Sequence, residues 1–276
     1  MLRRLCIRLV GRARWVRTVT HWTELYHALL PPRTRGMPII TGHLVKPGDC
    51  VLDVGANIGR ITHALARAVG SRGRVHAFEP TPMARRVLES LVALLRLRQV
   101  TVVPAAVGRG AGMLELLVPL MDGWKPLHQI THQAQGSQAQ GLRLSVPCLC
   151  LDDYWRGLGE PDIAFVKCDT EGHELSVLEG ARGLLTRCLP AAFCEVEEPY
   201  LARQGQRPAQ VFDLFHGLGY RAFRANGSGQ LAPVAGYEAR SSYFFIHPRR
   251  WPKSLNEILV PTIVLPADHA PLPDPS

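Results

Sequence analysis

The sequence contains no uncharged apolar run of the roughly 18 residues that a membrane-spanning helix requires. We therefore expect no transmembrane helix. The chain has 276 residues, of which 46% are hydrophobic. That is enough to bury one sizeable core, and too little for two large ones.

The sequence also lacks C-x-x-C pairs, the usual signature of zinc sites and redox disulfides. Its seven cysteines are an odd number. Cys148 and Cys150 are two residues apart, which is the spacing of one strand face rather than of zinc ligands. Several other cysteines lie in apolar runs. We expect small buried thiols in a reducing compartment, and we predict a cytoplasmic protein.

Acidic residues are scarce at the N-terminus. Residues 1–35 hold eight of the 32 lysines and arginines but only one of the 23 acidic residues, Glu24. The rest of the chain is nearly neutral, whereas a nucleic-acid-binding domain is basic across its working face. We predict that residues 1–42 form a basic helical segment that caps the domain or touches an anionic surface. A mitochondrial targeting segment is the alternative. The oligomeric state is left open.

Short apolar runs alternate with helical patterns over the central part of the chain. This alternation predicts an α/β fold with a doubly wound, mostly parallel sheet. The predicted strands are 50–53, 74–78, 100–103, 113–118, 142–149, 163–169, 192–196, 219–224 and 240–246. The predicted helices are 57–69, 82–98, 174–186 and 208–217.

Two segments depart from this alternation. Residues 121–141 are rich in glutamine, and we expect an exposed, mobile insertion there. Residues 248–276 contain seven prolines, so we expect an irregular tail that contributes little to the core. Near the end of the domain, Asn226-Gly227 predicts a hairpin that joins strands 219–224 and 240–246.

A glycine-containing turn follows the first strand and opens a helix. Glycine allows the backbone to turn sharply and approach a ligand, and a helix N-terminus offers unpaired N–H groups. Glu79 ends the second strand, where an acid can accept both ribose hydroxyls of an adenosine ligand. The residues predicted to bind a cofactor here are Asp53, Gly55, Ala56, Asn57, Gly59 and Glu79.

Both a dinucleotide and S-adenosylmethionine fit such a turn. A dinucleotide fold uses G-x-G-x-x-G to approach a pyrophosphate, but here Gly55 and Gly59 are four residues apart. The carboxylate of Asp53 would repel a pyrophosphate and could accept a hydrogen bond from the ammonium of a methionine moiety. The turn therefore favours a methyltransferase over a dehydrogenase.

A second group of titratable residues, Lys167 to Glu174, lies at the carboxyl end of the fourth parallel strand, where ligands bind in open α/β sheets. Helix capping by Asp169 or Thr170 is the simplest explanation. However, a lysine in an apolar strand needs a partner, and Glu195 on the next strand is the natural one. The predicted catalytic residues are Asp169, Glu171, His173 and Glu195, and Asp169 is also predicted to contact the cofactor.

These residues belong to motifs that resemble the FkbM family of methyltransferases. The motifs are VLDVGANIGRIT, RVHAFEPTP, VPAAVG, LDDYW, FVKCDTEGHELSVLEGA and SYFFIHP, and the resemblance covers roughly residues 43–247. It implies a class I methyltransferase fold, Rossmann-like, with seven strands of which the last is antiparallel. It also implies S-adenosylmethionine as the donor and methylation of a hydroxyl.

The resemblance leaves the acceptor open among sugars, glycans and natural products. The general base is open between Glu171 and His173, and the acidic group could hold a divalent cation instead, although no metal site is predicted. Two other functions remain as alternatives. One is a methyltransferase-like binding module without turnover, and the other is an NAD-linked oxidoreductase.

Overall fold

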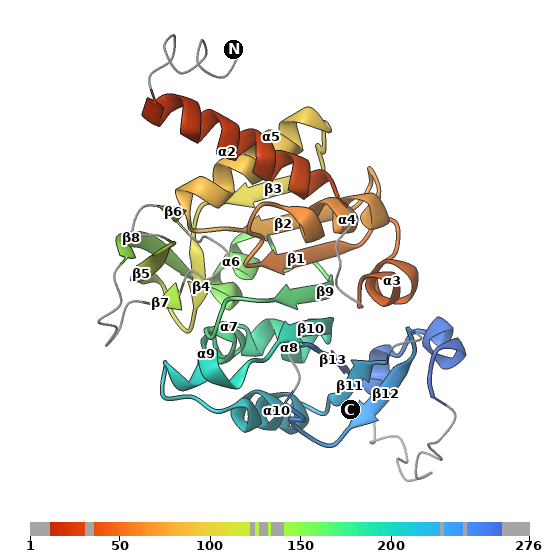
Figure 1. Ribbon diagram of the computed structural model, residues 1–276. Coiled ribbons are helices and arrows are strands. Elements are labelled where there is room, and N and C mark those ends of the chain that lie inside the picture. The colour runs from red at the N-terminus through yellow and green to blue at the C-terminus, as the bar shows by residue number, and fades with distance from the viewer. Residues whose placement is uncertain are drawn as a thin grey trace.

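The computed structural model describes residues 12–30, 36–121, 125–126, 132–133, 141–226, 229–239 and 242–260. Its central sheet has eight strands: β1 (Cys50–Val54), β2 (Arg74–Phe78), β3 (Val100–Val103), β9 (Ile163–Cys168), β10 (Ala191–Glu195), β11 (Arg221–Ala225), β12 (Leu231–Val234) and β13 (Ser242–Ile246). The strand order is β12-β11-β13-β10-β9-β1-β2-β3 (Figure 1). The neighbours from β10 to β3 are parallel, and β13 is antiparallel to both β10 and β11.

Helices cover both faces of this sheet because the side chains of each buried strand alternate between two cores. Val51 belongs to one core, which it shares with α3 (Met37–Ile39), η1 (Ile40–Leu44) and α4 (Arg60–Val69). Leu52 belongs to the other, which it shares with α6 (Leu151–Gly157), α7 (Glu174–Glu179), α8 (Arg182–Cys188) and α10 (Pro208–Gly217). A further helix, α5 (Pro82–Leu94), packs through Leu88 on Ala77 of β2.

The predicted fold class is confirmed, with two corrections. The hairpin at Asn226 joins β11 to β12, an edge strand that the sequence analysis did not predict, and not to β13. Pro233 lies within β12, and an edge strand tolerates proline because one side of it needs no ladder donor. The predicted helix 174–186 is two helices, α7 and α8, and between them Gly180 lies so close to Gly108 that a Cβ atom would collide with its carbonyl oxygen.

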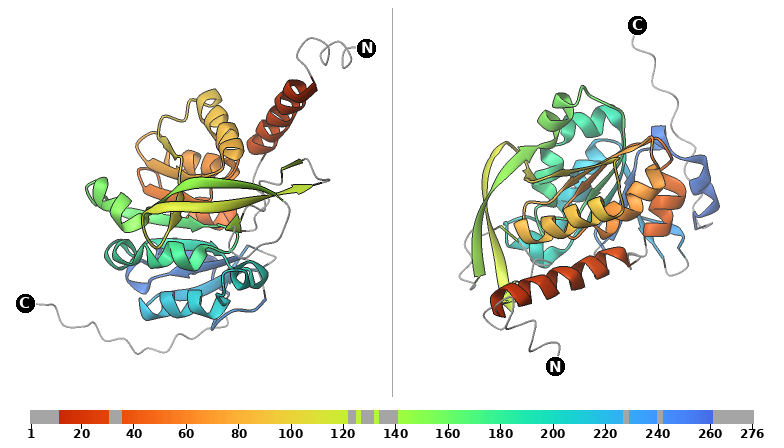
Figure 2. Two further views of the ribbon diagram at one scale, coloured as in Figure 1. Left: turned by 90° about the vertical axis from the view of Figure 1, so that its left-hand side faces the viewer. Right: turned by 90° about the horizontal axis from the view of Figure 1, so that it is seen from above.

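A second, smaller sheet lies across the carboxyl edge of the central one (Figure 2). It consists of β4 (Ala106–Gly108), β5 (Gly112–Met121), β6 (Lys125–Pro126), β7 (His132–Gln133) and β8 (Gly141–Cys150). The long pair β5 and β8 is antiparallel. Most of the predicted insertion 121–141 lies outside the described residues.

The N-terminal helix α2 (Arg12–Leu29) packs on the outer side of α5 and α4. Leu25 and Ala28 are buried against Ile58, Val87 and Leu91. The second half of this helix therefore belongs to the domain. The apolar face of α2 covers α5, and the expected contact of residues 1–42 with an anionic surface stays a prediction.

The described part of the C-terminal tail also contributes to the core, which corrects the expectation. Residues Pro248–Arg250 (η3) and Lys253–Glu257 (η4) form short 3-10 helices. Leu255 is fully buried, and Trp251 packs on Phe223. Proline prevents long regular elements, but it does not prevent apolar side chains between the prolines from being buried.

No helix among the described residues is long and apolar enough to cross a membrane.

Candidate donor and acceptor site

A pocket opens where β1, β2, β3 and β9 end and where β5 crosses them. It contains about 740 Å³ of open space that is continuous with solvent. Its wall is formed by the turn after β1, the segment after β2, the start of β4, two leucines of β5 and the loop after β9. The lining residues are Val54, Gly55, Asn57, Phe78–Thr81, Ala105–Val107, Leu114, Leu116, Asp169–Glu171 and His173.

The turn after β1 has a backbone that only particular residues can adopt. Gly55 has φ +76°, and a Cβ atom there would collide with the carbonyl oxygen of Asp169. Gly59 has φ +93° and lies immediately before α4. Asn57 has φ +52°, and its side-chain oxygen is buried without a hydrogen-bond partner among the described residues. Ala56 lies behind the turn, packed with Leu88.

Glu79 is buried at the end of β2 and lines the same pocket. Its Oε2 accepts a 2.9 Å hydrogen bond from the backbone N–H of Asn57, and its Oε1 accepts from the N–H and the hydroxyl of Thr81. Burial raises the pKa of Glu79, and these donors partly offset the effect. The carboxylate therefore joins the ends of β1 and β2 while facing the pocket.

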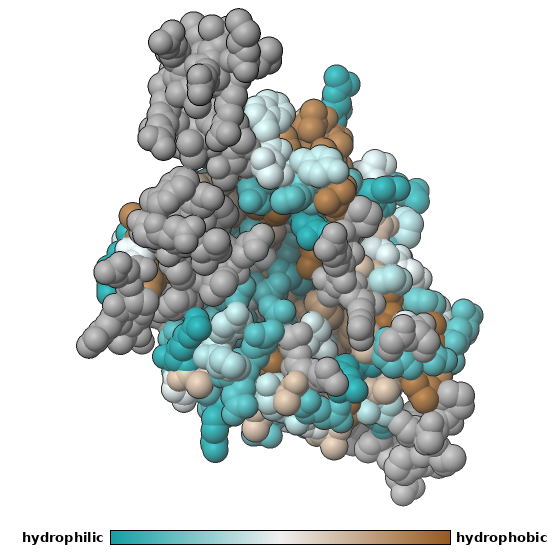
Figure 3. Space-filling model, viewed as in Figure 1, coloured by the Kyte–Doolittle hydropathy of each residue, from teal (hydrophilic) through white to brown (hydrophobic). Residues whose placement is uncertain are grey.

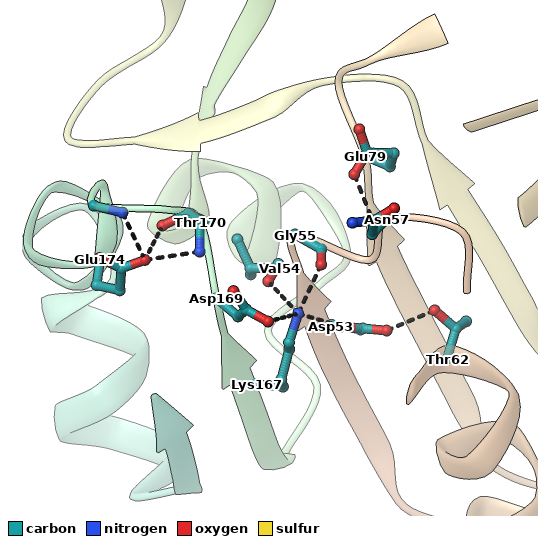
Figure 4. Close-up of polar contacts among 11 residues, drawn as sticks. Asp53, Val54, Gly55, Asn57, Thr62, Glu79, Lys167, Asp169, Thr170 and Glu174 are labelled. Carbon is teal, nitrogen blue, oxygen red and sulfur yellow. Dashed lines mark hydrogen bonds and ion pairs between the residues drawn. The ribbon is translucent and has the colours of Figure 1, made fainter. Parts of the chain in front are cut away.

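Lys167 lies at the centre of the polar contacts in Figure 4 and is only 2% exposed. Its Nζ donates to the carbonyl oxygens of Gly55 at 2.6 Å and Val54 at 3.3 Å. The same atom lies 3.3 Å from Oδ2 of Asp169 and 3.6 Å from Oδ1 of Asp53. Burial alone would lower the pKa of Lys167, but the two carboxylates raise it. One ammonium group thus ties the turn after β1 to the loop after β9.

The predicted pairing of Lys167 with Glu195 is wrong. Asp53, which is fully buried, takes that role together with Asp169, because β1 neighbours β9 in parallel register and places Asp53 directly beside Lys167. The other oxygen of Asp53 accepts a 2.6 Å hydrogen bond from the hydroxyl of Thr62. Asp53 does not line the pocket.

Three carboxyl groups gather on the other side of the pocket. Oxygens of Asp169, Glu171 and Glu195 lie within 4.8 Å of one another, a spacing suited to a shared proton or a bound cation. Burial and the neighbouring acids raise the pKa of Glu171 to about 8 and that of Glu195 to about 9. Glu197, two residues beyond Glu195, adds to both shifts. No single positive charge in the group balances these acids, since Lys167 is shared with Asp53.

The loop between β9 and α7 is held by Glu174 rather than by the predicted caps. Oε1 of Glu174 accepts hydrogen bonds from the N–H and the hydroxyl of Thr170 and from the N–H of Gly172. His173, and neither Asp169 nor Thr170, occupies the position before the first helical residue. The helix begins at Glu174, as predicted, but the predicted caps do not precede it.

Glu171 and His173 both reach the pocket with unpaired atoms. Glu171 has φ +57°, and its Oε2 is buried without a partner among the described residues. Nδ1 of His173 is also buried without a partner among the described residues, and burial lowers the pKa of the imidazole. The arrangement leaves acceptor atoms available to a ligand on this side.

The sequence analysis missed Thr62, Thr81 and Glu197 as parts of the site. Glu197 could have been predicted from the sequence, because it lies two residues after Glu195 and therefore on the same side of an extended chain. Thr62 and Thr81 could not, since a threonine near a helix start is common.

Comparisons with known proteins agree with this geometry. Residues 53–222 match the sequence profile described as the methyltransferase FkbM domain. Among solved structures, the chain is similar to the methyltransferase FkbM from Methylobacillus flagellatus KT, with 16% identity over 86% of this chain and 60% of that chain and a TM-score of 0.46. The chain thus spans less than two thirds of the length of that protein. No curated protein sequence matches the chain.

Two further solved structures show a similar likeness. One is an S-adenosylmethionine-dependent O-methyltransferase from Thermotoga maritima, with 17% identity over 76% of this chain and 63% of that chain and a TM-score of 0.38. The other is a fibrillarin from Aeropyrum pernix with natively bound S-adenosylmethionine, with 14% identity over 76% of this chain and 73% of that chain and a TM-score of 0.44.

The sheet order and the matched profile define a methyltransferase domain. The chain belongs to the FkbM methyltransferase family.

Proposed function

We propose that the protein transfers a methyl group from S-adenosylmethionine to a hydroxyl group of a sugar, glycan or natural product. The observation that carries the proposal is the group Asp169, Glu171 and Glu195 beside the donor pocket, with the pKa of Glu171 raised to about 8. An alcohol is a poor nucleophile until its proton is being removed, and a base is most effective when its pKa lies near the working pH.

The donor pocket has groups that fit S-adenosylmethionine. Asn57 offers a buried, unpaired oxygen, and Glu79 faces the pocket with a carboxylate that retains accepting capacity. We assign Glu79 to the ribose hydroxyls, and Gly55, Asn57 and Asp169 to the methionine end of the donor. When bound, the donor supplies a methyl group on a positively charged sulfur. Asp53 acts through Lys167, because its carboxylate is directed away from the pocket.

In the proposed reaction, Glu171 accepts the proton of the acceptor hydroxyl. The hydroxyl oxygen forms the new bond to the methyl carbon, and the electrons of the broken carbon–sulfur bond remain on sulfur. Asp169 and Glu195 lie beside Glu171 and position the hydroxyl. His173 is the alternative base, since its lowered pKa keeps the imidazole neutral and able to accept a proton.

Single substitutions distinguish these roles once an acceptor is found in a donor-dependent screen of hydroxyl-bearing sugars and natural products. Glu171→Gln is expected to lower turnover by about 10²–10⁴-fold and to leave donor affinity unchanged. Asp213→Asn, on the exposed side of α10, is the control and should change neither. If Glu171→Gln and His173→Ala both keep normal turnover, the loop is structural only. Loss of activity with a chelator and recovery with magnesium would make the three carboxylates metal ligands.

We propose that segment 121–141 covers the acceptor, because it connects β8 to β5, and Leu114 and Leu116 of β5 line the donor pocket. Replacing this segment with a short Gly-Ser link should weaken acceptor binding and spare donor binding. Equal acceptor kinetics in the shortened form would count against this placement.

Ligand-dependent stability separates the remaining alternatives. S-adenosylhomocysteine at 100-fold above its dissociation constant should add about 2.7 kcal/mol to the free energy of unfolding, and NAD should add nothing. A binding module would show the same stabilisation without any turnover in the screen. The free cysteines at 50, 148, 150, 168, 188 and 194 support the proposed cytoplasmic location.

A further inference from the structure

Three large side chains on α2 are exposed in one line. Trp22, Tyr26 and Leu29 follow the i, i+4, i+7 spacing of a single helix face and are 63%, 61% and 39% exposed. We call them the α2 stripe. Leu25 and Ala28, on an adjacent face, are buried against α5. The α2 stripe is therefore separate from the face of α2 that packs on the core. It is a second apolar face, and no described residue covers it.

The α2 stripe leads into a cleft between α2, α3 and α4. Leu29 belongs to both, and the cleft is otherwise lined by Leu30, Met37, Pro38, Thr41, Arg60, His63, Ala64, Arg67 and Ala68. These lining residues include two arginines and a histidine and no acidic residue. Apolar and basic groups thus share one continuous surface.

This surface lies at one end of the molecule. In both ribbon figures α2 is the outermost helix beyond α5, and Figure 3 shows apolar side chains reaching the surface at that end. In the sequence, residues 1–35 contain eight arginines and a single acid, Glu24. A helix with an apolar face and an excess of arginine is the pattern that lies in the interface of an anionic membrane, and Trp and Tyr are the side chains enriched at that depth.

We propose that the α2 stripe and the basic cleft dock the protein on the surface of a bilayer that contains anionic lipids. Trp22 and Tyr26 insert at headgroup level, and the arginines of the cleft face lipid phosphates. Docking of this kind places the methyltransferase domain beside the membrane without any spanning helix. The inference does not depend on the identity of the acceptor, and it is independent of the catalytic roles proposed above.

Co-sedimentation with vesicles tests the proposal on the full chain. We expect binding to vesicles of phosphatidylcholine with phosphatidylglycerol, little binding to phosphatidylcholine alone, and release at high salt because screening weakens the attraction. Trp22→Ala with Tyr26→Ala should weaken binding by at least about tenfold, the effect of keeping one large side chain out of an apolar phase. Arg67→Gln should weaken it by about fivefold.

The matched control is Met113→Ala with Leu158→Ala, two exposed apolar side chains on other elements. This control should bind vesicles like the unchanged protein, and both double variants should keep the affinity for S-adenosylhomocysteine, which shows that they are folded. Equal binding to both vesicle types, equal loss in the stripe and control variants, or no binding to vesicles would overturn the proposal. Self-association without lipid that the stripe variant abolishes would also overturn it, in favour of a second copy of the chain.

Discussion

The two sides of the pocket differ in how their polar groups are satisfied. On the donor side, Glu79 accepts three hydrogen bonds from Asn57 and Thr81, and Lys167 has two carbonyl and two carboxylate partners. On the acceptor side, Glu171 and His173 carry buried atoms without partners among the described residues. The donor side is therefore mostly paired before any ligand binds, with Oδ1 of Asn57 as an exception among the described residues, and the acceptor side is not.

The difference has a physical consequence for each side. A pre-formed donor site loses little conformational entropy on binding, so its contacts contribute fully to affinity. Unsatisfied buried acids are destabilising, and they persist where a substrate supplies the missing partner. The comparison therefore predicts that donor-side substitutions change folding and donor affinity, and that acceptor-side substitutions change turnover and pH dependence.

The largest effect is expected from Lys167→Met. The substitution keeps the volume of the side chain and leaves Asp53 as a fully buried carboxylate without its cation. Breaking one half of a buried ion pair costs about 3–5 kcal/mol, which urea unfolding would measure. The double variant with Asp53→Asn should recover part of the loss. A Lys167→Met protein as stable as the unchanged one would break the donor-side half of the comparison.

Gly55→Ala should have the next largest effect. A Cβ atom would collide with the carbonyl oxygen of Asp169, and φ at Gly55 is +76°. The conformation alone costs about 1–3 kcal/mol for a residue other than glycine, and relief of the collision would move the turn. Gly48→Ala is the control, because φ is +96° but nothing lies within 4 Å. Calorimetry should show weaker donor binding for Gly55→Ala only.

Glu79→Gln should have a smaller effect, because it changes only the hydrogen bonds of one carboxylate. The amide can still accept from Asn57 but loses the charge and one acceptor. Donor binding should weaken by about 1.5–3 kcal/mol, the range for hydrogen bonds to a charged group. Unchanged donor affinity in calorimetry would show that Glu79 does not bind the ribose of the donor.

The last effect concerns the pH dependence of stability. The pKa of Glu171 is raised from 4.5 to about 8 and that of Glu195 to about 9, so the folded state binds more protons than the unfolded state between these values. The free energy of unfolding should therefore fall as the pH rises from about 5 to about 9. Glu171→Gln with Glu195→Gln should flatten this slope. An unchanged slope in urea unfolding would show that other groups cause it.

The sequence was sufficient for the elements whose patterns are local. Strands such as 74–78 and helices such as 208–217 have the observed bounds, because period-2 and period-3.6 patterns report burial directly. The turn from Asp53 to Gly59 was placed at the pocket because glycine and asparagine there need positive φ, as three of these residues have.

Pairings between distant segments were not accessible in the same way. The partner of Lys167 depends on which strands are neighbours and in what register. Asp53 is 114 positions away along the chain, and Glu195 was the predicted partner. The break at Gly180 depends on the backbone of β4, and the burial of Leu255 depends on a surface formed by α3 and β12. Each is a tertiary contact that leaves no local pattern.

The central claim, that the acceptor side holds carboxylic acids which titrate far above their ordinary range, can be tested directly by carbon-13 NMR of the glutamate carboxyl groups without any acceptor. The account predicts two carboxyl signals that titrate near pH 8 and 9, one lost in Glu171→Gln and the other in Glu195→Gln. If both groups titrate below about pH 6, close to the ordinary value for glutamate, the acceptor side is an ordinary set of solvated carboxylates and the proposed base is wrong.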